Sequence, residues 1–267
     1  MNEIKVIVTG ACGRMGQEVV RAVSKEHDMS LVGAVDAVSS GEDIGKLCGI
    51  GERGIKVSGD LKGTIEKTNP DVMVDFTNPK VVMDNLRTAL TNKVASVVGT
   101  SGFDEAMRRD VEDLARNNDI GVVIAPNFSI GAILMIKFAK EAMKYLPNAE
   151  IMELHHDKKL DAPSATALRT AELMLEGRPS TADVKRIEEI EKLQNVRGGN
   201  LGGIRIHSIR LPGLVAHQEV ILGGLGQILT IRHDSISRES FMPGVILAIR
   251  KIKSIKGLVY GLESLLE

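Results

Sequence analysis

A glycine-rich turn near the start of the chain constrains the fold more than any other feature. The sequence VIVTGACGRMGQEVV places Gly10, Gly13 and Gly16 between an apolar run typical of a buried strand and a segment with helical spacing. Glycine lets the backbone turn tightly and lets a pyrophosphate approach the amides at the start of the helix. The spacing G-x-x-G-x-x-G differs from the commoner G-x-G-x-x-G. The turn nevertheless predicts a Rossmann-type domain that binds a dinucleotide.

The first half of the chain alternates strand and helix patterns. Short apolar runs predict buried strands at residues 5–9, 31–36, 71–76, 95–99 and 121–125. Segments with helical spacing lie between them, and Asp104 is of the residue type that caps the start of a helix. Alternating strands and helices form parallel sheets that are covered by helices on both faces. We therefore expect an α/β fold with a doubly wound parallel sheet.

After residue 126 the pattern changes. Helical spacing at 130–145 is followed by a predicted strand at 150–155, a helix at 166–176 and a polar loop at 177–200. Three strands are predicted at 204–211, 217–222 and 227–233, joined as antiparallel hairpins by short glycine-bearing turns. A helix at 238–252 and another short helix close the chain. We expect a dinucleotide-binding domain at 1–126 and 236–267, and a smaller α+β domain with a mainly antiparallel sheet at 127–235.

Composition limits the partners of the chain. The 267 residues suffice for two domains, and 43% hydrophobic with 26% charged residues is typical of a globular protein. A net charge of -1 argues against nucleic acid or an anionic membrane as partner. The sequence shows no signal-peptide pattern and no apolar run of about 20 residues. With only Cys12 and Cys48 as cysteines, we expect a cytoplasmic protein whose clustered positive charge acts on a small anion.

Asp36 ends the second predicted strand, about 20 residues beyond the glycine turn, where dinucleotide-binding domains place an acid on the ribose hydroxyls. A carboxylate there repels the 2′-phosphate of NADP, and Ala37 offers no compensating cation. Arg14 acts in the opposite direction, because a guanidinium in the turn can reach a phosphate. On balance we expect NADH as the favoured cofactor and NADPH as the other choice. The alternative is a turn that only packs helix on strand, with Asp36 a solvated strand end.

The segment HHDKKLDAPSAT, residues 155–166, concentrates positive charge in a nearly neutral chain. Neighbouring strand residues point to opposite faces, so His155 and His156 do not converge on a metal, and we expect no metal site. Ser164 and Thr166 are helix-capping types, and the free amides at a helix start attract a carboxylate. A histidine beside them can transfer a proton near neutral pH. We expect the active site of an enzyme for an acidic small molecule; a core histidine with solvated lysines is the plainer alternative.

The same segment carries a resemblance to a known family. The run ELHHDKKLDAPSATA is similar to the signature E-x-H-H-x-x-K-x-D-x-P-S-G-T-A of the 4-hydroxy-tetrahydrodipicolinate reductases, also called dihydrodipicolinate reductases, of bacterial lysine biosynthesis. The resemblance extends to VTGACGRMG at the start, DFTNP at 75–79, VGTSGF at 98–103 and APNFSIG at 125–131. It therefore covers most of the chain.

The resemblance implies an oxidoreductase that reduces a cyclic dicarboxylate to tetrahydrodipicolinate with NAD(P)H, in the diaminopimelate and lysine pathway. It implies His156 as the general acid, Lys159 as its paired lysine and His155 as a substrate-lining neighbour. Family members are homotetramers, commonly built through the sheet of the second domain, which would then bind substrate and form the oligomer. The remaining implied residues are Ser164, Ala165 and Thr166 for a substrate carboxylate and, for the cofactor, Gly10, Gly13, Arg14, Met15, Gly16, Asp36, Gly99, Thr100, Ser101, Ala125 and Phe128.

Two positions depart from the family pattern. Ala165 replaces the usual glycine beside the substrate carboxylate, and its methyl group can crowd the anion. Asn78 stands where some members carry arginine, which takes away a contact to a 2′-phosphate and again favours NADH. Family members nevertheless often use both cofactors.

Further expectations concern the second half of the chain. Asp161 is expected either to orient Lys159 or to cap the turn. The joining segments 126–131 and 236–238 are expected to act as hinges whose closure expels water. Four residues of the predicted hairpin strands are expected to face solvent: Arg205, His207, Arg210 and His217.

Two other classes of protein remain open. One is another nicotinamide-dependent enzyme of similar architecture, such as an aspartate or homoserine dehydrogenase; the segment 155–166 argues against it, because those reactions do not require it. The other is a non-catalytic NAD-binding sensor, which would lack a proton donor and an anion site.

Overall fold

The computed structural model describes residues 3–180 and 190–266. The chain divides into two compact units, Met1–Phe128 with Arg238–Glu267, and Ser129–Ser237. It crosses between them after Phe128 and after Ser237, two residues beyond each expected domain boundary and within the expected joining segments 126–131 and 236–238. Each unit has its own sheet and its own buried apolar cluster.

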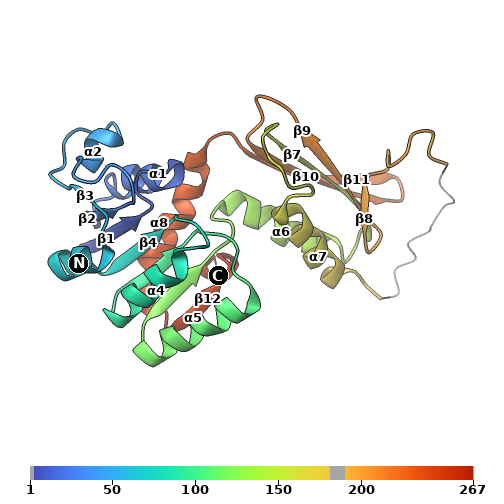
Figure 1. Ribbon diagram of the computed structural model, residues 1–267. Helices are drawn as coiled ribbons and strands as arrows, with labels where there is room; N and C mark the ends of the chain where they lie inside the picture. Colours follow the sequence, from blue (N-terminus) through green and yellow to red (C-terminus); the bar gives the residue numbers. More distant parts are fainter. Residues whose placement is uncertain (1–2, 181–189, 267) are drawn as a thin grey trace. The chain divides into compact units, whose positions relative to one another are not determined.

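The first unit is built on a seven-stranded sheet in the order β12-β6-β5-β4-β1-β2-β3, and every neighbouring pair runs parallel (Figure 1). The five strands expected from the sequence are all present. Strand order reverses between β1 and β4, and ligands of such sheets bind beyond the carboxyl ends of the strands at that point. The strands are β1 (Ile4–Thr9), β2 (Met29–Val35), β3 (Val57–Ser58), β4 (Val72–Asp75), β5 (Ala95–Val98), β6 (Gly121–Ile124) and β12 (Gly257–Tyr260).

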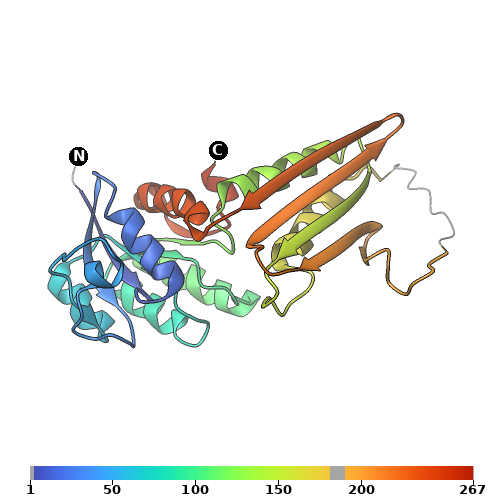
Figure 2. The same ribbon diagram turned by 90° about the horizontal axis from the view of Figure 1, so that it is seen from above.

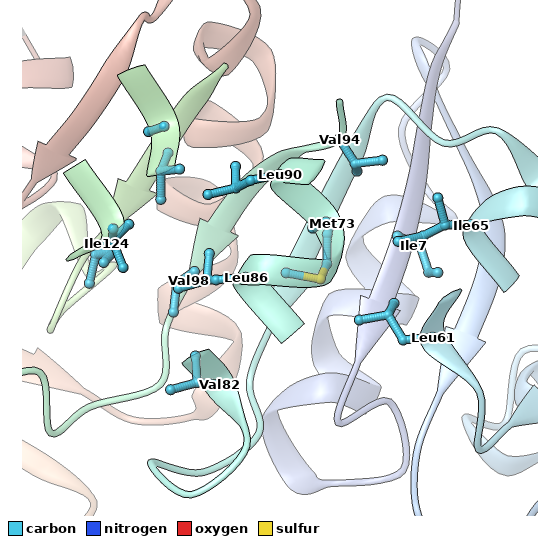
Figure 3. Packing of buried hydrophobic residues seen from close by; sticks show 14 of the residues in the cluster. Ile7, Leu61, Ile65, Met73, Val82, Leu86, Leu90, Val94, Val98 and Ile124 are labelled. Atoms are coloured by element: carbon cyan, nitrogen blue, oxygen red, sulfur yellow. The ribbon is translucent and has the colours of Figure 1, made fainter. Parts of the chain in front are cut away.

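Helices cover the parallel sheet. Among them α1 and α8 contact each other, and α3, α4 and α5 contribute to one apolar cluster with the strands. Figure 3 shows that cluster, in which Ile7 and Met73 of the sheet pack among helix residues such as Leu86 and Leu90. These helices are α1 (Arg14–Val23), α2 (Ile44–Leu47), α3 (Leu61–Thr68), α4 (Val82–Thr91), α5 (Glu105–Asn118), η1 (Arg238–Phe241), α8 (Met242–Lys251), η2 (Ile252–Ser254) and η3 (Glu263–Leu265).

The end of the chain differs from the sequence expectation. A short 3-10 helix, η3, does follow, but the sequence missed the strand β12 before it, which pairs in parallel with β6 and extends the sheet. A run as short as GLVY has no periodicity that separates a strand from a helix. The pairing edge offered by β6 decides the structure of this segment.

The second unit is a five-stranded sheet with α6 (Ile130–Ala142) and α7 (Ala165–Gly177) packed against one face, as Figure 2 shows. The order is β11-β10-β7-β9-β8, mostly antiparallel, with β7 and β9 parallel. Met135 and Met174 of the helices pack on Ile151 and Val220 of the sheet. The strands are β7 (Asn148–His155), β8 (Gly199–Leu201), β9 (Ile204–Arg210), β10 (Ala216–Gly224) and β11 (Gln227–Ser235).

The expected run of hairpins is only half correct. β10 and β11 form the hairpin, but β9 does not pair with β10, because β7 lies between them. Alternation of apolar residues predicts which face of a strand is buried and does not say which strand is its neighbour. The predicted loop 177–200 contains β8 at its end, and its residues 181–189 lie outside the described part of the chain.

Candidate active site

The glycine turn at the end of β1 is so tight that two of its positions exclude any side chain. Gly10 has a φ of +71°, and a Cβ there would lie 2.5 Å from the carbonyl oxygen of Phe76. A Cβ on Gly16 would lie 1.9 Å from the carbonyl oxygen of Gly10. Gly13 is the N-cap of α1, and its amide donates to the Gly10 carbonyl at 3.0 Å. The backbone thus forms a cradle without side chains at the start of a helix, which fits a pyrophosphate.

The other expected residues of this turn lie beside that cradle. Arg14 is exposed and Met15 is half-buried, and their amides open the first turn of α1, where negative charge is favoured. The carboxylate of Asp36 accepts hydrogen bonds from the amides of Cys12 at 2.9 Å and Val38 at 3.2 Å. The structure therefore brings the acid at the end of β2 against the glycine turn.

Asp75, at the end of β4, is a buried carboxylate that the sequence reasoning did not single out. It is 0% exposed and accepts hydrogen bonds from the hydroxyl of Thr9 at 2.8 Å and that of Thr100 at 2.7 Å. Three further donors are the amide and hydroxyl of Thr77 and the side-chain amide of Asn85. One carboxylate thus ties together the ends of β1, β4 and β5.

Phe76 follows Asp75 and gathers the second group of expected cofactor residues. A Cβ on Gly99 would lie 2.1 Å from the Phe76 ring, so that ring requires a glycine at this position. The Phe128 ring lies 5.9 Å from it, centroid to centroid, and is buried. Ala125, which follows β6, is also buried, whereas Ser101 is exposed. Because the Phe76 carbonyl also faces Gly10, the two groups of expected cofactor residues adjoin.

The charged segment begins where β7 ends, at His155, and ends where α7 begins. Ser164 is the N-cap of α7, and its hydroxyl accepts from the Ala167 amide at 3.2 Å. The Ser164 amide donates a hydrogen bond to the Glu153 carboxylate at 3.3 Å, so this amide is not available to bind a substrate anion. The amides of Ala165 and Thr166, in the first turn, take no part in these contacts. They are the donors of this helix start that can meet an anion.

Glu153 is a second buried carboxylate; it begins the run that resembles the family signature, but the sequence assigned it no role. Its side chain is 0% exposed and faces the Nδ1 atom of His155 at 2.5 Å and the guanidinium of Arg210 at 2.8 and 3.0 Å. Burial by itself raises the pKa of Glu153, but the hydrogen bonds from His155 and Arg210 outweigh it and lower the pKa to about 2. The group is therefore an anion at neutral pH.

The remaining expected residues lie in the loop between β7 and α7. The Lys159 amide donates to the His156 carbonyl at 3.1 Å, which makes a turn that brings the two backbones together. The Lys159 ammonium contacts both carboxylate oxygens of Asp161, at 2.7 and 2.8 Å. Asp161 therefore orients Lys159, one of its two expected roles. The His156 side chain is half-buried.

The expectation that the strand residues of this unit face solvent is wrong for Arg210 and His217. Their side chains are 18% and 12% exposed, because Arg210 pairs with Glu153 and His217 with Asp234. His207, 25% exposed, pairs with Glu150 at 2.8 Å. A polar side chain can be buried when a hydrogen-bonding partner lies across the sheet, and that partner cannot be predicted from its own strand.

The fold and the site define a class of protein. A parallel sheet with a glycine cradle at its switch point and an acid at the end of β2 is that of a dinucleotide-binding protein of the Rossmann type. Within the described residues no group of three or more His, Cys, Asp or Glu side chains is arranged to hold a metal ion. No helix in that part of the chain has the length and apolar character needed to cross a membrane.

Comparisons with known proteins identify the family. Two family models, described as the N-terminus and the C-terminus of dihydrodipicolinate reductase, match residues 4–128 and 131–266. A 4-hydroxy-tetrahydrodipicolinate reductase of Desulfitobacterium hafniense is 53% identical over the full length of both chains, and one of Moorella thermoacetica is 50% identical over 99% of this chain and 98% of its own. The solved structure of a dipicolinate-bound dihydrodipicolinate reductase from Paenisporosarcina sp. TG-14 is 44% identical and superposes with a TM-score of 0.86, covering 98% of this chain and 99% of that one. The chain belongs to the dihydrodipicolinate reductase family and is an oxidoreductase.

Proposed function

We propose that this chain reduces 4-hydroxy-tetrahydrodipicolinate to tetrahydrodipicolinate with a nicotinamide dinucleotide, in the diaminopimelate and lysine pathway. One observation carries the proposal. The chain matches 4-hydroxy-tetrahydrodipicolinate reductases along its whole length at about half identity, and the segment that resembles their signature leads into a capped helix start. Loss of water from the hydroxylated ring gives an unsaturated ring, and one hydride with one proton then reduces it. The nicotinamide supplies the hydride when it is bound.

The first unit is the proposed site of the cofactor. Gly10, Gly13 and Gly16 leave room for the pyrophosphate beside the amides of Arg14 and Met15. We propose that the nicotinamide lies near Gly99, Thr100, Ser101, Ala125 and Phe128 at the ends of β5 and β6.

NADH is the proposed preference. Asp36 lies against the glycine turn, where its charge opposes a 2′-phosphate and its oxygens can accept from ribose hydroxyls. The side chain of Asn78 accepts from the Lys80 amide at 3.0 Å in a local turn, and it provides no positive charge. Arg14 is the residue of the turn that would favour NADPH.

The start of α7 is the proposed site of a substrate carboxylate. The amides of Ala165 and Thr166 would donate to it, together with the hydroxyl of Ser164, and the helix dipole adds to the attraction. Lys159 would offset further negative charge of the diacid. The solved relative that superposes on this chain carries dipicolinate, a compound of this acidic class.

Either of two adjacent histidines can be the proton donor. The sequence assigns the role to His156, and that remains our proposal from the family signature. One contact favours His155 as a second candidate: because Glu153 is an anion, the Nδ1 atom of His155 must donate to it, which leaves Nε2 as the nitrogen that can meet a substrate. Separate substitutions of the two residues decide between them.

The proposed oligomer is a homotetramer that forms through the sheet of the second unit, in the cytoplasm. The sheet face opposite α6 and α7 carries apolar residues between charged ones, among them Met152, Leu154 and Ile221. On β11, the edge strand, Ile228 is 74% exposed. Partly exposed apolar side chains that share one face of a sheet are compatible with an interface. Light scattering on the purified protein tests the proposal, and a monomer at micromolar concentration would contradict it.

A coupled assay tests the function. The substrate is generated by a synthase from pyruvate and aspartate semialdehyde, and oxidation of NADH or NADPH is followed by absorbance. We expect turnover that depends on the synthase product and is inhibited by dipicolinate. Binding of NADH without turnover would instead indicate a sensor, and oxidation of NADH by aspartate semialdehyde in the absence of the synthase would indicate another dehydrogenase.

A further inference from the structure

The buried Glu153 and its partner Arg210 hold the loop between β7 and α7. Its carboxylate and its partner Arg210 contact the loop between β7 and α7 at three separate places. Glu153 accepts from the ring of His155 at one end of the loop and from the Ser164 amide at the other. Arg210 donates to the backbone carbonyl of Asp161, in the middle of the loop, at 2.7 Å.

These three places are the ones on which the proposed chemistry depends. The His155 ring is a candidate proton donor. Asp161 holds the Lys159 ammonium through its side chain, so fixing the Asp161 backbone also fixes the cation. Ser164 is the cap of the helix whose first amides would hold the substrate carboxylate. One ion pair therefore sets the mutual placement of imidazole, ammonium and helix start.

A neighbouring ion pair shows that this linkage is not a general property of the sheet. Glu150 lies on the same strand and also pairs with an arginine and a histidine, Arg197 at 2.6 Å and His207 at 2.8 Å. Its side chain is 36% exposed, and its carboxylate accepts hydrogen bonds from those two side chains, neither of which belongs to the loop 156–164. The chain thus contains its own matched control.

We propose that Glu153 and Arg210 are positioning residues of the reductase reaction, which together hold the proton donor, Lys159 and the start of α7 in one arrangement. This inference rests on the proposed function and names how its site is organised. Neither residue needs to touch the substrate. A misplacement of about 1 Å in such a group costs on the order of 100-fold in rate.

Arg210→Lys is the first test. Lysine keeps the buried positive charge opposite Glu153, but its single ammonium cannot form the two-pronged contact with the carboxylate and reach the Asp161 carbonyl as well. We expect kcat/KM for the dicarboxylate to fall ~30–100-fold and the Kd for dipicolinate, measured by calorimetry, to rise about 10-fold. The Kd for NADH should stay within about twofold, because the cofactor residues lie in the other unit.

Glu153→Gln with Arg210→Met is the second test. The double variant removes both charges, so no unpaired ion is left in the core and stability returns toward that of the wild type. We expect Glu153→Gln alone to lower kcat/KM for the dicarboxylate, and we expect kcat/KM of the double variant to stay as low. A purely structural role would predict that activity recovers together with the melting temperature, and that result would overturn the proposal.

Glu150→Gln serves as the control and should keep wild-type kcat/KM and dipicolinate affinity. An equal loss in Glu150→Gln would mean that any ion pair of β7 has the same effect, which would also overturn the proposal. Wild-type turnover is measured first. Its absence refutes the proposed function, while the dipicolinate affinities of the same variants still test the positioning of Ala165 and Thr166.

Discussion

The carboxylate of Asp36 and the backbone amide of Cys12 are joined by a hydrogen bond of 2.9 Å. The bond ties the end of β2 to the glycine turn that follows β1. A carboxylate has about four lone-pair sites, and the amides of Cys12 and Val38 use two of them. The other sites can accept from ribose hydroxyls. The contact therefore fixes a negative charge at the place where the proposed preference for NADH requires one.

Asp36→Ala is expected to change the cofactor preference. Removal of the carboxylate takes away both the ribose acceptor and the repulsion of a 2′-phosphate. We expect kcat/KM with NADH to fall and the ratio of NADPH to NADH efficiency to rise by ~10-fold, or about 1.4 kcal/mol. Initial rates with each cofactor at saturating dicarboxylate give this ratio.

Asp60→Ala is the control for that variant. Asp60 caps α3 in the same unit and does not contact the glycine turn. Its loss should cost about 1 kcal/mol of stability and leave the cofactor ratio unchanged. An equal fall of kcat/KM with NADH and with NADPH in Asp36→Ala would mean that Asp36 only supports the turn.

Gly16→Ala is expected to abolish cofactor binding. The added Cβ would meet the Gly10 carbonyl oxygen at 1.9 Å, and that oxygen belongs to the backbone of the turn, so it can give way only if the turn opens. We expect the Kd for NADH, measured by fluorescence, to rise by at least ~10-fold. Gly59→Ala is the control, because the nearest atom to its Cβ is the Asp36 carbonyl oxygen at 4.0 Å. NADH affinity that survives in Gly16→Ala would contradict the proposed placement of the pyrophosphate.

Much of the fold follows from local patterns. Strands such as β1 and β6 are continuous apolar runs, and their type and order predict a parallel sheet. The errors concern relations between distant segments. β12 is a strand because β6 offers a free edge, and β9 is separated from β10 because β7 pairs with both. Neither strand pairing can be predicted from the hydrophobic periodicity of the segments themselves.

The candidate site likewise contains residues that the sequence predicts and residues that it does not. The glycine turn and the loop 155–166 are contiguous motifs and were found, whereas Glu153 and Arg210, 57 positions apart, meet only in the folded sheet. Two signals were available for Glu153: it begins the run that resembles the family signature, and the alternation along its strand places it in the core. Glu153 lies two residues after the buried Ile151 on the same strand. Because alternate side chains of a strand point to the same face, its carboxylate is expected to face the core. Asp75 likewise ends an apolar run that is buried throughout.

Paired substitutions of the adjacent histidines should identify the proton donor. In the donor, replacement by glutamine removes the transferable proton and lowers kcat by ~100-fold or more, with NADH affinity unchanged. We expect this result for His156→Gln from the family signature, and for His155→Gln if its contact with Glu153 marks the donor. Single-turnover rates measure the step directly. Wild-type rates in both variants would remove the imidazoles from proton transfer.

Acid sensitivity provides a test of the Glu153 ion pair that does not depend on activity. The pKa of Glu153 is about 2 in the folded chain against an ordinary 4.5, so the unfolded chain binds more protons in this range. The pair therefore stabilises the fold fully at pH values above ~4.5. As the pH falls toward 2, this contribution to the free energy of unfolding, about 3 kcal/mol, is lost. Urea unfolding of the wild type and Glu153→Gln at pH 7 and pH 3 measures the difference. We expect the wild type to lose more stability between the two pH values than the variant; equal losses would show that the Glu153 carboxylate is not held by its partners in solution.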